Sequence, residues 1–300
     1  MPTSIPVSTT TDLAPSRRPR SPGFWSDARR RILKSRAAMS GGLVVALFVA
    51  LAALAPMLAP YEPLRGRLDE RLLPPSTGHW FGTDELGRDV LSRVLYGARI
   101  SLQIQVAAVG LALVLGTALG VVAGYVGRWP DMLIMRIVDI MMAFPGIFLA
   151  LAIIAALGTG LGNVIIASAI FLVPQFARVI RGSVLTLKEK EFIEAARALG
   201  EGDVPIIVRY LLPNSLAPII VQTSLRMATV LLTASGLSFL GLGVQPPSPE
   251  WGAMLSNARA YMITAPHVAT VPGLAIMLVV LGFNLLGDGL RDALDPRLRE

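Results

Sequence analysis

The sequence contains no cysteine, which excludes disulfides, a thiol nucleophile and cysteine-based metal sites. It has only two histidines, His79 and His267, far apart in the chain, so a histidine-rich metal centre is not expected. Charged residues make up only 16% of the 300 residues, whereas about a quarter is usual in soluble domains. Together with 53% hydrophobic residues and a mean hydropathy of +0.62, this shortage of charge indicates a membrane protein.

The gaps between charged residues locate the membrane spans, because about 20 apolar residues cross a bilayer as one helix. The gap at 140–177 is too long for one crossing, and its glycine-rich segment 158–163 predicts a turn between two helices. Pro145-Gly146 is expected to kink the first of these two. The sequence therefore predicts six spans, at 39–58, 100–127, two within 140–177, 214–242 and 260–287.

The distribution of lysine and arginine predicts that both termini are cytoplasmic. Nineteen of the 27 basic residues then lie on the cytoplasmic side and six on the other. The net charge of +7 is thus interpreted as a topology bias rather than a nucleic-acid footprint. Cleavage of the first span as a signal peptide is not expected, because a long basic segment precedes it and Pro56 follows the Ala53-Leu54-Ala55 site.

The polar segment between spans four and five predicts two short amphipathic helices. The residues from Thr186 to Glu189 fit a capping box that begins the first helix, and Gly200 suits its end. Asp203 can cap the second helix, which Pro213 ends. Each helix is too short to be stable alone, so the pair should dock on the chain's own spans, on the membrane surface or on a partner. The expected apolar faces are Phe192, Ala195, Ala196 and Leu199, and Val204, Ile207, Val208 and Leu211.

This segment resembles the EAA motif of ABC importer permeases, with Glu194-Ala195-Ala196, then Gly200, then Leu212-Pro213. In that family the loop carries a coupling helix that sits in a cleft of the ATP-hydrolysing subunit. The resemblance implies an ATPase-coupling set made of Glu194, Ala195, Ala196, Gly200, Asp203, Leu212 and Pro213.

Three further segments resemble the dipeptide/oligopeptide subgroup: FGTDELGRD at 81–89, LSFLGLG at 237–243 and GDGLRD at 287–292. The variant resembled is the second, C-type permease of the pair. The resemblance implies an all-α polytopic protein of the bacterial inner membrane, with the six-helix type I importer permease fold. The expected parts are a disordered basic cytoplasmic tail (1–36), the first transmembrane helix (37–60), an extracytoplasmic loop with an interfacial helix (61–98), a five-helix permease core with a coupling loop at 186–213 (99–290) and a cytoplasmic tail (291–300).

The implied function is a permease subunit that forms half of a translocation pathway for di- or oligopeptides. The implied partners are a second homologous permease, two ABC ATPase subunits, an extracytoplasmic substrate-binding protein and the lipid bilayer, with no nucleic acid. ATP and Mg²⁺ would be used by the ATPase subunits, and no cofactor or metal is expected to bind directly, since no Gly-x-x-x-x-Gly-Lys-Ser/Thr segment is present. Nickel chelates, glutathione and oligosaccharides are carried by relatives of this scaffold and remain alternative substrates.

Two other classes of function fit the sequence less well. An intramembrane enzyme would need clustered catalytic groups, and the sequence has no His-Glu-x-x-His, no Gly-x-Ser-x-Gly and no paired intramembrane carboxylates. A membrane scaffold would not need the two-helix segment at this spacing. A non-catalytic transport subunit is therefore expected.

Arg226 interrupts the fifth apolar gap, and a charge at mid-membrane costs about 2.5–3.5 kcal/mol on insertion scales. Gln222, Arg226, Thr229 and Thr233 share one helical face, which Ser215 extends. This face is predicted to line the translocation pathway, where Arg226 would attract a peptide carboxylate. The alternatives are that Arg226 pairs with a carboxylate of the partner permease, or that it snorkels.

In the 61–98 loop, Val90, Val94 and Leu95 share a face from which Arg88 and Arg93 are absent. This pattern predicts a short helix lying at the outer membrane interface. His79 is expected at the surface of the loop. The loop either contacts the substrate-binding protein or simply seals the top of the transporter.

Overall fold

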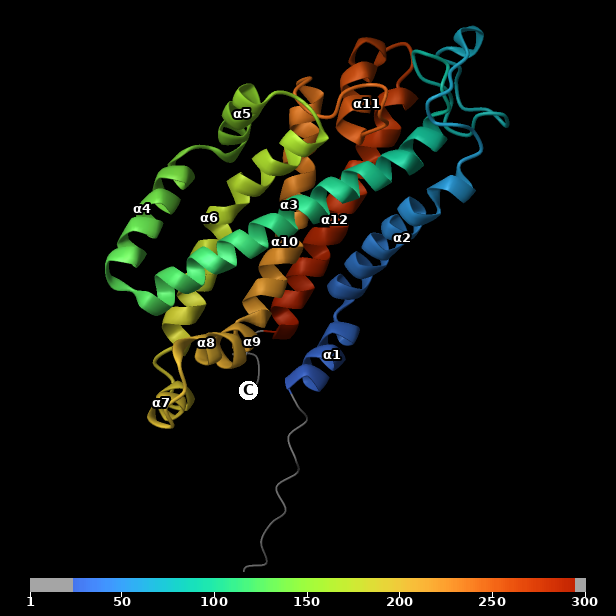
Figure 1. The fold of residues 1–300 in the computed structure, drawn as a ribbon. Helices are drawn as coiled ribbons and strands as arrows, with labels where there is room; N and C mark the ends of the chain where they lie inside the picture. Colours follow the sequence, from blue (N-terminus) through green and yellow to red (C-terminus); the bar gives the residue numbers. More distant parts are fainter. Residues whose placement is uncertain (1–23, 295–300) are drawn as a thin grey trace, which may run out of the picture.

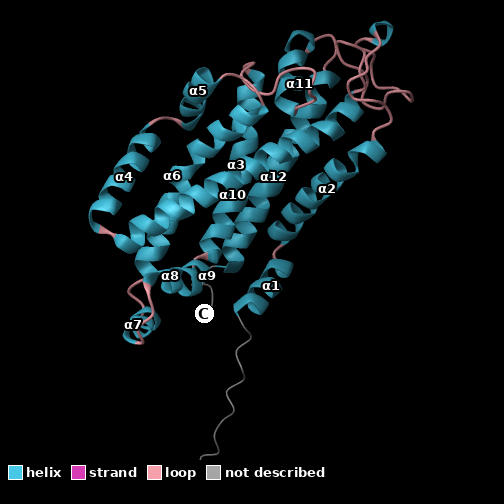
Figure 2. Cartoon of the chain, viewed as in Figure 1, coloured by secondary structure: helices cyan, strands magenta, loops and turns pink. Residues whose placement is uncertain are grey.

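The computed structural model describes residues 24–294, and the described chain is almost entirely helical (Figure 2). Its long helices are α2 Arg36–Leu58, α3 Val90–Val126, α6 Leu161–Leu187, α10 Leu216–Phe239 and α12 His267–Leu294. Shorter helical segments flank or join them: α1 Phe24–Lys34, η1 Leu68–Glu70, α4 Arg128–Ala143, α5 Gly146–Leu157, α7 Glu191–Ala198, α8 Asp203–Pro205, η2 Ile206–Leu211, α9 Leu212–Asn214, α11 Trp251–Ala258 and η3 Arg259–Tyr261.

Both predicted tails differ from the structure. Disorder over 1–36 is wrong for residues 24–34, which form α1, a segment rich in good helix formers such as Arg, Ala, Leu and Lys. Helix α12 continues to Leu294 and so covers the start of the predicted tail 291–300. Residues 1–23 and 295–300 lie outside the described part of the chain.

Within the described residues, five helices are long and apolar enough to cross a membrane, and the bent pair α4–α5 brings the number to as many as six. The prediction of a polytopic helical protein with six spans is therefore confirmed at the level of length and composition. The predicted kink at Pro145-Gly146 is real, since α4 and α5 are bent by 96° at this break. The predicted turn between α5 and α6 is also present, with Gly158 at φ +88° and Gly160 at φ +130°.

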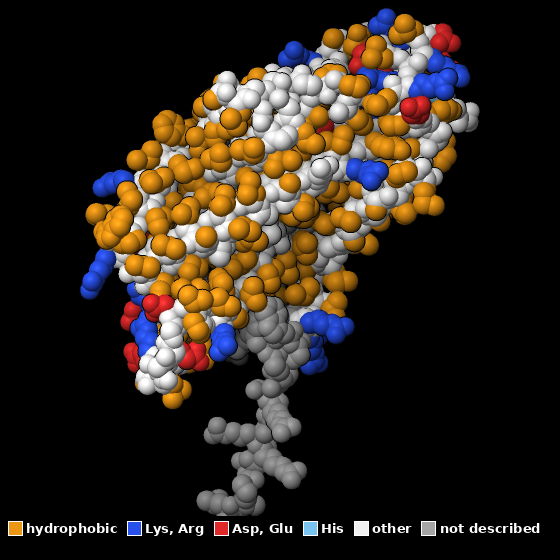
Figure 3. Space-filling model, in the orientation of Figure 1, with side chains coloured by type: hydrophobic (Ala, Val, Ile, Leu, Met, Phe, Trp, Pro, Cys, Tyr) orange, Lys and Arg blue, Asp and Glu red, His pale blue; other side chains and the backbone are white. Residues whose placement is uncertain are grey.

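The two ends of the bundle differ. The segments α7, α8 and α9 lie at one end together with α1 and the last turns of α12, whereas α11 and the loop that follows α2 lie at the other (Figure 1). Charged side chains gather mainly at these two ends, and hydrophobic side chains cover most of the surface between them (Figure 3). This arrangement fits an even number of crossings, and the assignment of the α7 end to the cytoplasm stays a prediction.

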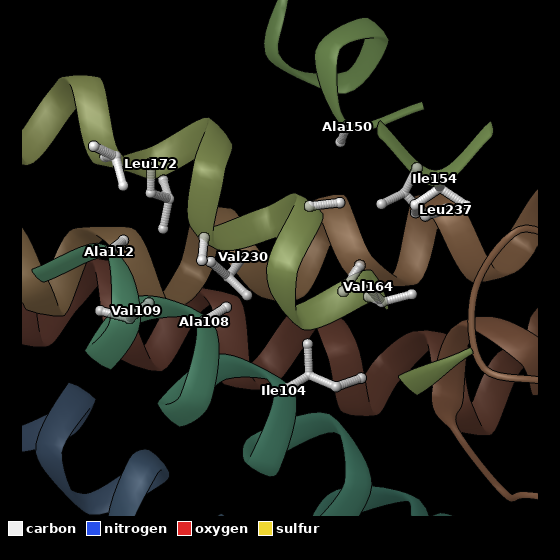
Figure 4. Packing of buried hydrophobic residues seen from close by; sticks show 14 of the residues in the cluster. Ile104, Ala108, Val109, Ala112, Ala150, Ile154, Val164, Leu172, Val230 and Leu237 are labelled. Carbon is white, nitrogen blue, oxygen red and sulfur yellow. The ribbon is translucent and has the colours of Figure 1, made fainter. Parts of the chain in front are cut away.

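The core of the bundle joins α3, α5, α6 and α10. Its buried residues include those labelled in Figure 4: Ile104, Ala108, Val109, Ala112, Ala150, Ile154, Val164, Leu172, Val230 and Leu237. The most extensive helix pair is α3–α6. Gly116, Gly120 and Gly124 on α3 allow this close approach, because a Cβ at Gly120 would lie 2.6 Å from the carbonyl oxygen of Ala177.

The loop that follows α2 folds into a compact unit, residues 59–89, which we call the cap. The guanidinium Nε atoms of Arg88 and Arg93 lie 2.7 and 3.3 Å from Asp84 Oδ2, and all three side chains are buried. His79 Nδ1 donates to the carboxylate oxygen Oδ1 of Asp89 at 2.9 Å. Charges that are buried in this way need partners, and the cap supplies them through Asp84 and Asp89.

The predicted interfacial helix and the predicted surface position of His79 are wrong. Val90 begins α3, which continues without a break through the second span, and Val90 and Leu95 are buried inside the protein rather than against lipid. The His79 side chain is only 12% exposed because Asp89 and the Tyr61 ring cover it. Alternation of polar and apolar residues cannot distinguish a membrane interface from a buried ion-pair cluster.

Candidate functional site

The segment with the EAA-like residues is built from α7, α8, η2 and α9, and the predicted capping box at Thr186 does not start it. Helix α6 runs on to Leu187, and the hydroxyl of Thr186 donates back to the carbonyl of Gly182 at 3.0 Å. Helix α7 begins at Glu191 instead, after Lys190 in an extended conformation. The predicted end at Gly200 is confirmed, since Gly200 has φ +84° directly after the last turn.

The second helix of this segment also differs from its prediction. Asp203 begins α8, but its carboxylate accepts a hydrogen bond from the Tyr125 hydroxyl at 2.6 Å rather than capping the helix. Pro213 does not end the helix, because it lies in the first turn of α9, where its missing N–H costs nothing. The backbone then passes through Ser215 directly into α10.

Of the predicted apolar faces, only Ala196 on the first helix and Leu211 on the second are buried, so most of each face was assigned to the wrong side. The buried side chains are Ile193 and Ala196 on α7 and Ile206 and Leu211 on η2. Residues 206–211 form a π-helix, in which positions five apart share a face, so a reading at the α-helical period selects the wrong side. The apolar side chains left exposed are Phe192 at 41%, Leu199 at 85%, Val204 at 69% and Val208 at 56%.

The two alanines of the EAA-like motif have different surroundings. Ala196 is buried in a cluster with Val121, Ile180 and Val184 from the ends of α3 and α6. Ala195 and Glu194 are exposed on the opposite face, and α7 projects from the end of the bundle (Figure 1). A small side chain beside a carboxylate on a projecting helix is a surface that another protein can approach closely.

Polar contacts fix this segment to α3. The Arg197 guanidinium carbon lies 5.7 Å from the centroid of the Tyr125 ring, and the Lys188 ammonium donates to the carbonyl of Gly124 at 3.2 Å. Tyr125 carries no signal in the sequence, because its partner Asp203 lies 78 positions away and no local pattern links the two residues.

A second hydrogen bond of the same kind stays within the segment. The Tyr210 hydroxyl donates to Glu201 Oε1 at 2.9 Å. This hydrogen bond to a carboxylate raises the pKa of Tyr210, because the acceptor favours the protonated phenol.

The residues predicted to line the pathway lie on α10 and are half-buried: Gln222, Arg226, Thr229 and Thr233. With its amide oxygen turned toward Arg226, Gln222 accepts from Nε at 2.9 Å and from Nη2 at 3.2 Å. Ser215 does not extend this face, since it is fully buried and hydrogen-bonded to Ser183 of α6 at 3.0 Å.

Arg226 has no carboxylate partner in the described part of the chain. Among residues 29–294, whose side chains the structure describes, no aspartate or glutamate oxygen lies within 4.0 Å of its guanidinium nitrogens. No group of three or more His, Asp or Glu side chains able to hold a metal ion occurs there either. The neutral amide of Gln222 orients the guanidinium but leaves its charge uncompensated.

These features define a class of protein: a multi-pass helical membrane protein with a projecting helical segment at one end. Residues 116–300 match the family described as binding-protein-dependent transport system inner membrane component, and residues 23–75 match the N-terminal TM domain of oligopeptide transport permease C. The chain belongs to this family of ABC importer permeases, in its dipeptide/oligopeptide branch.

Curated relatives agree with this assignment. A dipeptide transport system permease protein of Alkalihalophilus pseudofirmus is 52% identical over 275 residues, which cover 92% of this chain and 90% of the relative. A glutathione transport system permease protein of Pectobacterium atrosepticum is 50% identical over 279 residues, which cover 92% of each chain. The glutathione transport system permease protein of Escherichia coli O157:H7 is 52% identical over 276 residues, which cover 92% of this chain and 91% of the relative.

Solved structures support the fold. A chain of the MetNI methionine ABC transporter, in an inward-facing conformation, superposes with a TM-score of 0.54 at 21% identity, covering 68% of this chain and 96% of that one. An amino acid ABC transporter gives a TM-score of 0.52 at 14% identity, covering 67% and 94%. The chain is thus a non-catalytic, multi-pass transport subunit of the bacterial inner membrane, and it works with ATPase and substrate-binding partners.

Proposed function

We propose that the chain forms half of a translocation pathway for short peptides and couples it to ATPase subunits through α7. The observation that carries the proposal is the projection of α7, with Glu194 and Ala195 exposed and with Ile193 and Ala196 buried against the rest of the protein. The exposed face is suited to a partner, and the buried face passes any displacement of α7 to α3 and α6. The ATP and Mg²⁺ of the cycle belong to the partner subunits.

The character of α10 supports peptides as the substrate class. A short peptide carries a terminal carboxylate, and Arg226 offers a half-buried cation whose charge is not compensated by a carboxylate of the described chain. Hydrogen bonds between charged groups are the stronger ones in a site of low dielectric. The names of the relatives fit this class, since a dipeptide and glutathione are both short peptides with free carboxylates. We propose that a second homologous permease supplies the other half of the pathway.

The test is reconstitution of the full complex. The chain, its partner permease, the two ATPases and the binding protein are placed in proteoliposomes, and uptake of labelled Ala-Ala and of labelled glutathione is measured with ATP inside. ATP-dependent accumulation of either peptide supports the proposal and identifies the substrate group. Accumulation of a nickel chelate or an oligosaccharide, with no peptide uptake, would contradict the proposed substrate.

The variant Arg226→Leu is expected to lower peptide uptake about tenfold while the complex still assembles, because a charged hydrogen bond contributes about 1.5–3 kcal/mol. The control is Arg226→Lys, which keeps the positive charge and should keep most of the uptake. The measurements are initial uptake rates and the subunit ratio after affinity purification. Loss of the partner permease from the purified complex would instead place Arg226 at the interface between the two permeases, and full uptake would exclude both roles.

A further inference from the structure

Helix α3 reaches from the cap to the α7 segment. It has 37 residues, which is about 55 Å of helix at 1.5 Å per residue. This exceeds the hydrocarbon thickness of about 30 Å, so both ends of α3 emerge from the membrane. At the cap end, Asp89 caps the helix through the Ser92 amide at 2.7 Å, and Arg93 is paired with Asp84.

The opposite end of α3 is held by three separate pieces of the α7–α8 segment. Lys188 holds the carbonyl of Gly124 from the turn before α7, Arg197 stacks on the Tyr125 ring from α7, and Asp203 accepts from the Tyr125 hydroxyl at the start of α8. Tyr125 therefore touches both short helices of the segment. A displacement of α7 and α8 reaches the last turn of α3 through this one side chain.

The middle of α3 is packed too closely against α6 to absorb such a displacement by bending. A Cβ at Gly116 or Gly124 would lie 2.5 Å or 2.9 Å from side-chain atoms of α6, so the two helices are in backbone contact along this stretch. Closely packed helices respond as rigid elements rather than by continuous deformation. Movement at one end of α3 is thus delivered to the cap at the other.

We propose that Tyr125 is the positioning residue that ties the α7–α8 segment to α3, and that α3 carries the coupling between the ATPase side and the cap. The inference rests on the proposed coupling role of α7. In this inference the hydroxyl of Tyr125, rather than its ring, couples the ATPase side of the protein to the cap. The consequence is that ATP hydrolysis can proceed without this hydroxyl. It is then no longer stimulated by the binding protein on the cap side.

The test uses the reconstituted full complex with Tyr125→Phe, which keeps the ring and its stacking contact with Arg197 and removes the hydroxyl that donates to Asp203. Basal ATPase activity and complex assembly are expected to stay at the wild-type level. Stimulation of the ATPase by binding protein saturated with Ala-Ala or glutathione should fall about tenfold, the worth of one hydrogen bond to a charged acceptor. ATP consumed per peptide transported should rise correspondingly.

Two further variants make the result specific. The double variant Tyr125→Phe/Asp203→Ala should be no worse than either single variant, since both remove the same bond. Tyr210→Phe removes a matched tyrosine–carboxylate bond that stays within the segment, and it should leave the stimulation intact. Full stimulation in Tyr125→Phe, additive losses in the double variant, or an equal loss in Tyr210→Phe would each overturn the inference. If Glu194→Lys abolishes uptake while Tyr125→Phe keeps full stimulation, only the role of Tyr125 fails; if Glu194→Lys leaves uptake intact, the coupling role of α7 fails.

Discussion

Replacement of Gly120 by leucine is expected to abolish the folded protein. A Cβ at this position would lie 2.6 Å from the carbonyl oxygen of Ala177 and 2.9 Å from Cβ of Ile180, and backbone cannot move aside as a flexible side chain can. Overpacking costs typically about 1–3 kcal/mol and sometimes more, and it acts here at the most extensive helix contact of the described chain. The measurement is the yield of monodisperse protein by size-exclusion chromatography in mild detergent.

The control for this variant lies on the same helix. A Cβ at Gly110 would meet no atom within 4 Å, so Gly110→Leu should give a yield close to that of the unaltered protein. It adds the same side chain to the same helix and removes a glycine in the same way. Equal yields of Gly120→Leu and Gly110→Leu would show that the α3–α6 contact tolerates separation and would contradict this account of the packing.

Charge reversal at Glu194 is expected to reduce peptide uptake to below a tenth of the original rate. Glu194 is exposed, and it forms no ion pair within residues 24–294, so lysine should not disturb the fold. Like charges brought together at an interface cost several kcal/mol, and each 1.4 kcal/mol is about a factor of ten in binding. Uptake in proteoliposomes and recovery of the ATPase subunits with the permease are the two measurements.

The matched control is Glu189→Lys. Glu189 is also exposed, but it lies in the turn before α7 rather than on the projecting face of that helix. This variant should transport at close to the original rate and should retain the ATPase subunits. Uptake by Glu194→Lys at the level of Glu189→Lys would rule out Glu194 as part of the ATPase contact.

The helical architecture was predictable because charge is absent over long stretches. The turn at 158–163 and the break at Pro145-Gly146 also follow from residues whose backbone preferences are strong. The start of α3 was not predictable in the same way. Val90, Leu95 and the neighbouring arginines form a pattern that fits an interfacial helix equally well, and only the tertiary partner Asp84 distinguishes the two arrangements.

The candidate site was predictable in position but not in orientation. The EAA-like spacing locates α7 and the glycine that ends it. It does not show that Ala195 is exposed while Ala196 is buried, because the direction of α7 is set by its packing on η2. The π-helical turn at 206–211 changes the side that faces the protein, and residue types alone carry no signal for it. The role of Tyr125 could not be predicted from the sequence, because it depends on Asp203, which is distant in the chain.

The break between α4 and α5 restricts what can surround this part of the molecule. At residues 143–146 the helical ladder is interrupted, and Phe144 and Pro145 are exposed on the isolated chain. Hydrocarbon offers no hydrogen-bond partner, so peptide groups released from a helix cannot face lipid tails. The break between α4 and α5 therefore has to face water or another protein chain. This side of the subunit is thus unsuited to contact the lipid that surrounds the assembled transporter.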